Sequence, residues 1–329
     1  MKSATANDVA RLAGVSRSAV SRTFSGNGFV SGEKREKIMK AAQQLNYRPN
    51  AIASSLASRQ SNLVAIIVNK LPDLRSPYFY YALMEAVQER GFFPLTVVLE
   101  PGEDGIRTLS KAAAYPVHGM VVMADSVHPA AAASIVSKTR PIVLNYQWSG
   151  DDAVDAVVID QRQGISEMVA HLAATGHRTV AYMGGRVTAI IASDRRRALI
   201  DAMVNHGLTL VAEGQGDFSY ERAYDETLRM FSNGVLPDAL FCANDRMAFA
   251  AMDALRQGLG RRVPEEISII GYDDNPTASW GAYGLSTIRQ RTSDVIAHIL
   301  SLLTNPSDMA GQFRGETEYV RRHTVASRS

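Results

Sequence analysis

From residue 62 onward the chain alternates short runs of β-branched and apolar residues with longer segments of helical pattern. A continuous apolar run of four to eight residues is typical of a strand buried on both faces, as in a parallel sheet covered by helices. The alternation therefore predicts an α/β domain whose parallel strands are joined by helices. The runs expected to be strands are 63–68, 93–100, 119–124, 141–145, 156–160, 180–185, 210–214, 239–245 and 267–274.

The segments between these runs have the apolar spacing of helices, and the pattern falls into two similar halves. A chain of 329 residues is too long for one compact core, so two or three domains are expected. The expected helices include 80–90, 163–175, 193–206, 220–233, 245–257 and 293–303. Glycines suited to a left-handed C-cap follow or end four of the predicted helices, at Gly91, Gly176, Gly207 and Gly258.

The first sixty residues contain a pair of short helical patterns joined by a tight corner. Thr5 and Asp8 have the spacing of a capping box that begins a first helix, and Gly14 ends it. Ser16 is a suitable N-cap for a second helix over 17–24. The connection from Gly14 to Ser16 has the length and chemistry of a helix-turn-helix corner.

Basic residues are concentrated in this segment. Residues 1–60 contain ten Lys or Arg against three acids, a net charge of +7, so the rest of the chain carries −5 because the whole carries +2. A third helix, expected to begin at Ser31, would close a three-helix core. A basic surface confined to one small segment is expected where that segment alone meets phosphate, but a solvated face explains it equally well.

Residue identities narrow these alternatives. Five motifs follow one another in this segment: DVA at 8–10, AGVS at 13–16, VSR at 20–22, VS at 30–31 and LNYRPN at 45–50. In this order and spacing they closely resemble the DNA-binding headpiece of the lactose-repressor (LacI) family of bacterial transcriptional regulators.

The resemblance implies a set of DNA contacts. Arg17 and Ser18 would read bases in the major groove, and an arginine can donate two hydrogen bonds to guanine O6 and N7. The alternative for Arg17 is a phosphate contact that carries no sequence information. The other residues implied to contact DNA are Thr5, Ser16, Ser21, Arg22 and Ser31, followed by Asn50, Ala53 and Leu56.

Residues 50–61 have a helical pattern that is short and poor in packing residues. Such a segment is mostly unfolded by itself, and in the family it resembles, it is the hinge helix that forms on operator DNA. Leu56 stands where that family has a leucine that enters the minor groove, partly unstacks a base step and kinks the duplex. The alternative is a linker with an incidental leucine.

The resemblance continues into the α/β region through SPYF at 76–79, TGHR at 175–178, NDRMA at 244–248 and GYDD at 271–274. It implies a periplasmic-binding-protein-like domain: two Rossmann-like lobes with parallel sheets, joined by three crossovers near residues 160, 290 and 320. The expected fold class is therefore an all-α helix-turn-helix headpiece followed by this α/β domain. The expected divisions are a headpiece at 1–49, a hinge at 50–61, an N-lobe at 62–160 plus 291–320, and a C-lobe at 161–290 plus 321–329.

Open α/β sheets bind ligands beyond the carboxyl ends of their strands, and here those ends are rich in Asn and Asp. The resemblance implies that Arg197, rather than its neighbours Arg195 and Arg196, clamps an effector with Asp273 opposite it. The other implied effector contacts are Tyr78, Phe79, Asn145, Ser193, Phe218 and Asn244. The arginine run could instead be a solvated face, and Phe218 could belong to the core.

Asp273 and Asp274 are adjacent, and adjacent side chains of an extended segment point to opposite sides. Only one of them can then face the ligand, and we expect it to be Asp273. The Asn and Asp set suits hydrogen bonds with hydroxyl groups, so a carbohydrate or a derivative is the expected effector.

Other classes of protein are disfavoured. The chain has no Gly-rich phosphate loop, no G-x-S-x-G or H-E-x-x-H motif, and a single cysteine, so we expect no enzyme, no cofactor, no disulfide and no metal site. A solute-binding protein of the same fold is the alternative, but it would need export and has no use for a basic headpiece. No apolar run has the length of a signal or a membrane span, which favours a cytoplasmic, nucleoid-associated protein. The expected partners are double-stranded, pseudo-palindromic operator DNA, a small-molecule effector and a second copy in a homodimer.

Overall fold

The computed structural model describes residues 4–25, 28–48, 61–70, 77–100, 102–124, 127, 129–135, 141–144, 154–233, 236–305 and 312–328. The chain divides into two compact units, Met1–Ser61 and Asn62–Ser329. Within the described ranges no helix combines the length and the apolar character that a membrane crossing requires.

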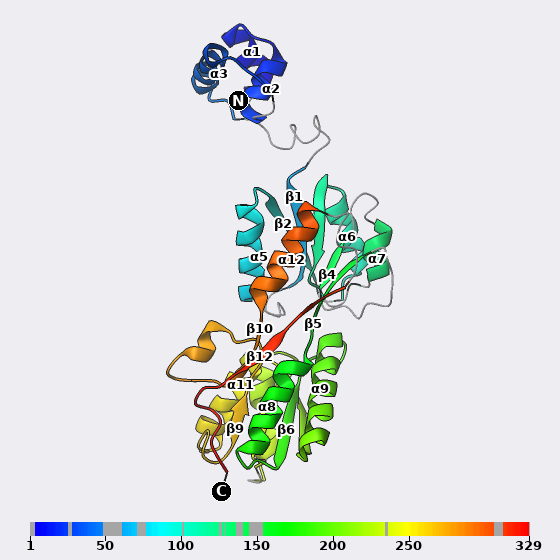
Figure 1. Ribbon diagram of the computed structural model, residues 1–329, viewed down its shortest axis with the longest axis vertical. Helices are drawn as coiled ribbons and strands as arrows, with labels where there is room; N and C mark the ends of the chain where they lie inside the picture. The colour runs from blue at the N-terminus through cyan, green and yellow to red at the C-terminus, as the bar shows by residue number, and fades with distance from the viewer. Residues whose placement is uncertain are drawn as a thin grey trace. The chain divides into compact units, whose positions relative to one another are not determined.

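The N-terminal unit is built from three helices, α1 (Ala6–Ala13), α2 (Arg17–Ser25) and α3 (Gly32–Gln44), drawn in blue in Figure 1. The predicted capping box of α1 is confirmed. The Thr5 hydroxyl accepts a hydrogen bond from the backbone N–H of Asp8, and the Asp8 carboxylate accepts one from the backbone N–H of Thr5. Gly14 ends the helix with a φ of 64°, a conformation that costs glycine least.

One residue from each helix fills the centre of this unit. Val9, Val20 and Ile38 are completely buried, so the three-helix core is confirmed. Ser16 caps α2, since its Oγ accepts a hydrogen bond from the backbone N–H of Ala19 at 3.2 Å. Ser31 stands at the N-cap of α3 but makes no hydrogen bond from its side chain to that helix.

The first lobe of the larger unit contains a six-stranded sheet in the order β2-β1-β3-β4-β5-β11, and every neighbouring pair is parallel. Its strands are β1 (Leu63–Asn69), β2 (Phe93–Leu99), β3 (Val117–Val122), β4 (Ile142–Leu144), β5 (Asp155–Ile159) and β11 (Gln312–Gly315). Ile66 packs against α5 (Pro77–Glu89) and α12 (Thr292–Thr304) on one face, and Ile67 packs against α6 (Gly105–Ala113) and α7 (Pro129–Ile135) on the other (Figure 1). This burial on both faces explains the continuous apolar run of β1.

The second lobe contains a four-stranded parallel sheet in the order β7-β6-β8-β9. Its strands are β6 (Thr179–Gly184), β7 (Thr209–Gln215), β8 (Ala239–Cys242) and β9 (Ser268–Ile270), and its helices are α8 (Arg162–Ala174), α9 (Ile190–His206), α10 (Tyr220–Phe231) and α11 (Asp245–Asp253). The α/β prediction for both lobes is thus confirmed.

Three of the four predicted C-cap glycines have the expected backbone, because Gly91, Gly176 and Gly207 have positive φ. The prediction for Gly258 is wrong. A π-helical turn over Ala254–Gly258 follows α11, so Gly258 lies inside helical structure. A Cβ there would lie 2.6 Å from the side chain of Leu228, which makes close packing the reason for this glycine.

The chain passes between the two sheets three times. The first passage joins β5 to α8, the second is β10 (Thr287–Gln290), and the third is β12 (Thr317–Val320). We call these the crossover segments (Figure 1). β10 and β12 pair in antiparallel fashion. The Thr317 hydroxyl donates to the backbone carbonyl of Asp160 at 2.9 Å and accepts from the backbone N–H of Gly164 at 3.0 Å, so the third crossover is bonded to the first.

Candidate functional site

The exposed face of α2 brings together most of the headpiece residues predicted to contact DNA. Ser16, Arg17, Ser18, Ser21 and Arg22 are all exposed. The hydroxyl oxygens of Ser16 and Ser18 lie 2.9 Å apart, and Nε of Arg22 donates to the backbone carbonyl of Ser18 at 3.3 Å. None of these five side chains belongs to the apolar core, so all are available to a partner.

Acidic side chains of the headpiece are neutralised on their own helices. In α1 Arg11 pairs with Asp8. In α3 Lys37 pairs with Glu33 at 2.7 Å, and Lys40 pairs in the same way with Glu36 at 2.9 Å. The hydrogen bond and charge of Lys37 lower the pKa of Glu33 below its usual value, so this acid stays ionised near neutral pH.

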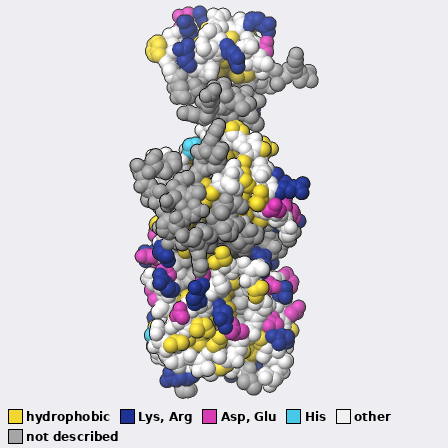
Figure 2. Space-filling view, turned by 90° about the vertical axis from the view of Figure 1, so that its right-hand side faces the viewer, with side chains coloured by type: hydrophobic (Ala, Val, Ile, Leu, Met, Phe, Trp, Pro, Cys, Tyr) yellow, Lys and Arg dark blue, Asp and Glu magenta, His cyan; other side chains and the backbone are white. Residues whose placement is uncertain are grey.

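Helix α2 contains no acidic residue. Among the described residues no ion pair includes Arg17 or Arg22. Figure 2 shows Lys and Arg side chains spread over the headpiece, with few acidic side chains between them. Because Arg17 and Arg22 of α2 have no acidic partner among the described residues, a phosphate backbone would attract these two cations most strongly.

Two further predicted DNA contacts stand at helix starts. Thr5 is exposed, but its hydroxyl is engaged in the capping box of α1. Ser31 is half-buried. The remaining three, Asn50, Ala53 and Leu56, lie outside the described residues.

In the α/β unit, the arginine opposite Asp273 is Arg195. Its side chain is completely buried, and its guanidinium donates to Oε1 of Gln161 at 3.2 Å, to the backbone carbonyl of Ala243, and to the Asp273 carboxylate at 3.5 Å. Its Cζ lies 3.5 Å from the centre of the Tyr272 ring, a cation–π contact. These partners follow β5, β8 and β9, so the guanidinium lies where the carboxyl ends of the strands converge.

The prediction that Arg197 lies opposite Asp273 is wrong. The side chain of Arg197 is 60% exposed and pairs with Asp194 at 2.5 Å, whereas Arg196 forms two hydrogen bonds with Glu213 at 2.6 and 2.7 Å. Residues two apart on an α-helix are separated by about 200° around its axis. A run of three arginines therefore cannot turn all of its members inward.

A signal for Arg195 was present in the sequence. Ile191, Leu199 and Ala202 are buried residues of α9, and they stand four before, four after and seven after Arg195. This spacing marks one face of a helix. The positions one turn from Arg197 include the polar residues Ser193 and Asp201, so the helical period places Arg195, and not Arg197, on the buried face.

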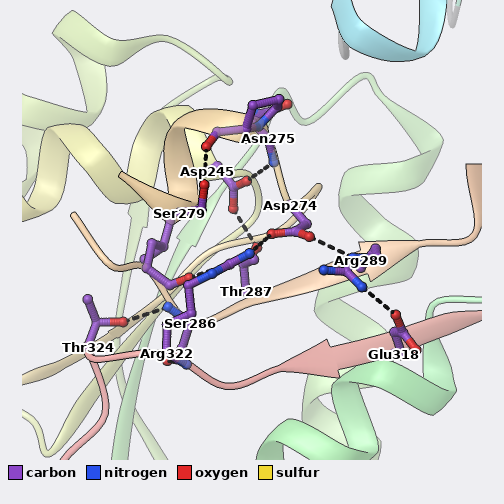
Figure 3. Close-up of polar contacts among 12 residues, drawn as sticks. Asp245, Asp274, Asn275, Ser279, Ser286, Thr287, Arg289, Glu318, Arg322 and Thr324 are labelled. Carbon is purple, nitrogen blue, oxygen red and sulfur yellow. Dashed lines mark hydrogen bonds and ion pairs between the residues drawn. The ribbon is translucent and has the colours of Figure 1, made fainter. Parts of the chain in front are cut away.

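Asp273 and Asp274 turn their carboxylates to different partners, as predicted, although the segment is not extended. Their φ angles are 116° and 53°, in the left-handed region that is unfavourable for residues other than glycine. Besides its arginine, Asp273 accepts a hydrogen bond from Nε2 of Gln290 at 2.9 Å. Asp274 accepts from Arg289 and Arg322, each at 2.6 Å (Figure 3).

Asp245, the first residue of α11, contributes a third carboxylate to this region. It is completely buried, and its two oxygens accept hydrogen bonds from the Thr287 hydroxyl at 2.5 Å and from the backbone N–H of Asn275 at 2.7 Å (Figure 3). Burial, followed by the nearby charge of Asp273, raises its pKa well above the usual range of an aspartate. It thereby ties the second crossover to the end of β8.

Other predicted effector contacts in the second lobe have structural contacts of their own. Asn244 caps α11, since its Oδ1 accepts a hydrogen bond from the backbone N–H of Met247 at 2.9 Å. Phe218 is half-buried and packs over Gly185, where an added Cβ would lie 2.0 Å from its ring. Ser193 is exposed, and its hydroxyl donates to a backbone carbonyl one turn earlier in α9 at 2.7 Å.

The predicted contacts from the first lobe lie at the start of α5. Tyr78 is 48% exposed. Phe79 is half-buried and packs against the core of the six-stranded sheet. Asn145 lies outside the described residues. The structure thus joins Asp273 to Arg195 and Gln290, and places Arg197 on the outside of α9.

Comparisons with known proteins agree with both units. Residues 5–50 match the model of the bacterial regulatory proteins of the lacI family, and residues 169–325 match a periplasmic binding protein-like domain. The lactose operon repressor of Escherichia coli (strain K12) is 30% identical over 294 residues, which cover 88% of this chain and 81% of that protein. The HTH-type transcriptional regulator CelR of Thermobifida fusca is 32% identical over 298 residues, 86% of each chain.

Solved structures show the same similarity in three dimensions. A crystal structure of the Lac repressor dimer bound to operator and the anti-inducer ONPF matches with a TM-score of 0.86 and 27% identity, covering 99% of this chain and 100% of that one. A complex of the transcriptional regulator CelR with cellobiose matches with a TM-score of 0.68 and 26% identity, covering 98% and 99%. With a helix-turn-helix headpiece, a two-lobed α/β unit and relatives over nearly its whole length, this chain belongs to the LacI family of bacterial DNA-binding transcriptional regulators.

Proposed function

We propose that this chain represses transcription as a homodimer on a pseudo-palindromic operator, and that a carbohydrate or sugar derivative bound between its lobes controls its affinity for DNA. The observation that carries the DNA part is the exposed face of α2. It presents two arginines and three serines on a helix without acidic residues. Such a face suits bidentate contacts with base edges together with phosphate contacts. The protein would then act at the nucleoid.

The effector part rests on the group around Arg195. Its guanidinium, the Asp273 carboxylate and the amides of Gln161 and Gln290 gather donors and acceptors within one network of hydrogen bonds. Sugars offer hydroxyl groups that donate and accept at once, which suits such a mixed set. The complex of CelR with cellobiose supports a carbohydrate for this chain as well. We therefore assign the role predicted for Arg197 to Arg195.

The dimer rests on an apolar surface of the first lobe. Tyr78 and Tyr81 of α5, with Val98 of the edge strand β2, are between 43% and 60% exposed. An apolar patch of this kind is typical of a protein contact. The operator-bound Lac repressor dimer supports the same assembly here. Sedimentation should give about twice the 35.7 kDa of one chain; a monomer on operator DNA would contradict the proposal.

DNA recognition is tested by selecting duplexes from a random library with the wild-type chain and measuring their affinity by fluorescence anisotropy. Arg17→Ala should weaken binding of the selected duplex by about 5- to 150-fold, the range for one bidentate base contact. Arg11→Ala is the matched control, since Arg11 is already paired with Asp8 on α1. Equal losses from both substitutions, or the absence of any enriched duplex, would contradict the assignment.

Effector binding is tested by thermal unfolding against a panel of mono- and disaccharides that includes cellobiose. A ligand at 100 times its Kd adds about 2.7 kcal/mol to stability, which is readily measured as a shift in Tm. Operator affinity is then measured with and without each stabilising sugar. If a sugar stabilises the chain but the chain enriches no duplex from the library, the result favours a solute-binding protein of the same fold.

A further inference from the structure

Asp274 joins two of the three crossover segments through a single carboxylate. Its Oδ1 accepts a hydrogen bond from Arg322, which follows β12, and its Oδ2 accepts one from Arg289 in β10, both at 2.6 Å (Figure 3). The Asp274 side chain is only 8% exposed. The segment that follows β9 is therefore anchored to β10 and to the residues that directly follow β12.

Both arginines are held by further contacts. Arg289 also donates to the Glu318 carboxylate of β12 at 3.0 Å. Arg322 also donates to the backbone carbonyl of Leu285 at 2.8 Å, and its backbone N–H donates to the Ser286 hydroxyl at 2.9 Å. Because each arginine is fixed at more than one point, a shift of Asp274 cannot be absorbed by rotation of an arginine alone. It must displace the crossover strands or break the ion pairs.

The same segment contains the candidate effector residue. Asp273 is joined to Asp274 by one peptide bond, and its backbone N–H donates to the carbonyl of Ile288 in β10 at 2.9 Å. Both aspartates have positive φ, which an aspartate keeps only when its surroundings enforce it. The two residues therefore form a short, rigid connection from the Arg195 contact to the crossover strands.

We propose that Asp274 is a positioning residue that transmits the state of the Arg195–Asp273 site to the crossover segments, and so couples effector and operator. The inference rests on the proposed function, because it concerns how the two ligands of that function affect each other. Coupling between two sites acts in both directions. DNA bound by the headpiece should therefore alter the segment 271–275, even without an effector.

A second ion pair at the crossovers provides a matched control. Arg291 follows β10 and pairs at 2.8 Å with Glu316, which precedes β12. Neither residue has a hydrogen bond or ion pair with Asp274 in the described part of the chain. Glu316→Gln thus removes a charge pair between the same crossover segments without touching the connection to Asp273.

The test is hydrogen–deuterium exchange of the full chain with and without a duplex selected by the wild type. In the wild type, duplex binding should change the exchange rates of amides in 271–275 and in β10. Asp274→Asn and Arg289→Gln should reduce this duplex-dependent change by about 2- to 30-fold, the range for substitutions between coupled sites. Glu316→Gln should retain it. A purely structural role would alter exchange equally in both states and leave the difference intact.

The inference is overturned if duplex binding leaves the exchange rates of amides 271–275 unchanged in the wild type. It is also overturned if Asp274→Asn keeps the full duplex-dependent change in exchange, or if Glu316→Gln reduces that change as much as Asp274→Asn does. Arg289→Gln carries the test if Asp274→Asn does not fold, because the Arg289 side chain is 46% exposed and tolerates change more readily. Failure of the proposed function is seen separately, since the wild type would then enrich no duplex at all.

Discussion

Arg195 and Asp273 face each other in the protein interior across 78 positions of sequence, with a guanidinium nitrogen 3.5 Å from a carboxylate oxygen. Removing two charges from water costs several kcal/mol each, and one ion contact seldom repays it. Here Gln161 and the Tyr272 ring complete the surroundings of the arginine, and Gln290 those of the aspartate. The pair is thus part of a network that a ligand could join by exchanging one hydrogen bond for another.

The first prediction concerns stability. Arg195→Met should lower the free energy of unfolding by about 3 to 5 kcal/mol, because it leaves the Asp273 carboxylate buried without its cation. Arg197→Met should cost less than about 1 kcal/mol, since an exposed ion pair contributes little. Urea unfolding of the two variants, read against the wild type, measures the difference. Comparable losses would mean that the two arginines are not distinguished by burial.

The second prediction concerns the effector response. Arg195→Lys keeps the charge but loses the planar fork that contacts three partners at once, so the effect of a stabilising sugar on operator affinity should disappear. Arg197→Ala should leave that effect unchanged. Anisotropy titrations with duplex, at increasing sugar, compare the two variants. A response lost in Arg197→Ala and kept in Arg195→Lys would restore the assignment made from the sequence.

The third prediction concerns pH and a carboxylate remote from both sites. Partial burial raises the pKa of Asp238, but hydrogen bonds from the backbone N–H groups of Arg178 and Thr179 and from the Thr179 hydroxyl outweigh it, and its pKa lies below the ordinary 3.8. A depressed folded-state pKa stabilises the protein above the unfolded-state value, and this stability is lost as the pH falls through the folded-state value.

Asp238→Asn should therefore lower the free energy of unfolding by about 1 to 3 kcal/mol at neutral pH. This difference from the wild type should narrow as the pH falls below about 3.8, the ordinary pKa of an aspartate. The control is Asp225→Asn, because Asp225 is exposed. Denaturant unfolding from pH 7 to pH 3 follows both variants. If the difference in free energy of unfolding between the wild type and Asp238→Asn widens on acidification, the pKa of Asp238 is not lowered by folding.

The fourth prediction concerns Leu56, which rests on the sequence alone. Leu56→Ala should weaken binding to the selected duplex while sparing binding to an unrelated one, because an apolar wedge contributes only where the duplex is kinked. Competition anisotropy at fixed salt gives both affinities. Equal loss on the two duplexes would assign residues 50–61 the role of a simple linker.

Local signals in the sequence were the most reliable. Thr5, Asp8 and Gly14 set the ends of α1 through contacts within one or two turns, so neighbouring residues suffice to predict them. The long strands are predicted equally well, because runs such as that of β1 are almost entirely apolar. The exposed face of α2 follows from the same local order.

Some elements that the sequence pattern does not predict depend on distant parts of the chain. β10 and β12 are four residues each, TIRQ and TEYV, and neither is an apolar run. They exist because they pair with each other, and Arg289 of β10 also pairs with Asp274. Helix α7 is hard to predict because its sequence, PAAAASI, has no periodic spacing of polar and apolar residues. The choice among three consecutive arginines likewise needed the packing of α9.

The separation between the headpiece core and the exposed face of α2 has an evolutionary consequence. Val9, Val20 and Ile38 fold the unit, while Arg17 and Ser21 lie outside its core. Surface substitutions of this kind usually change stability by less than about 0.5 kcal/mol. Under the role proposed for α2, a duplicated gene could therefore acquire a new binding sequence through a few codon changes on that helix, with no compensating mutation elsewhere. A designer could retarget the regulator by the same route.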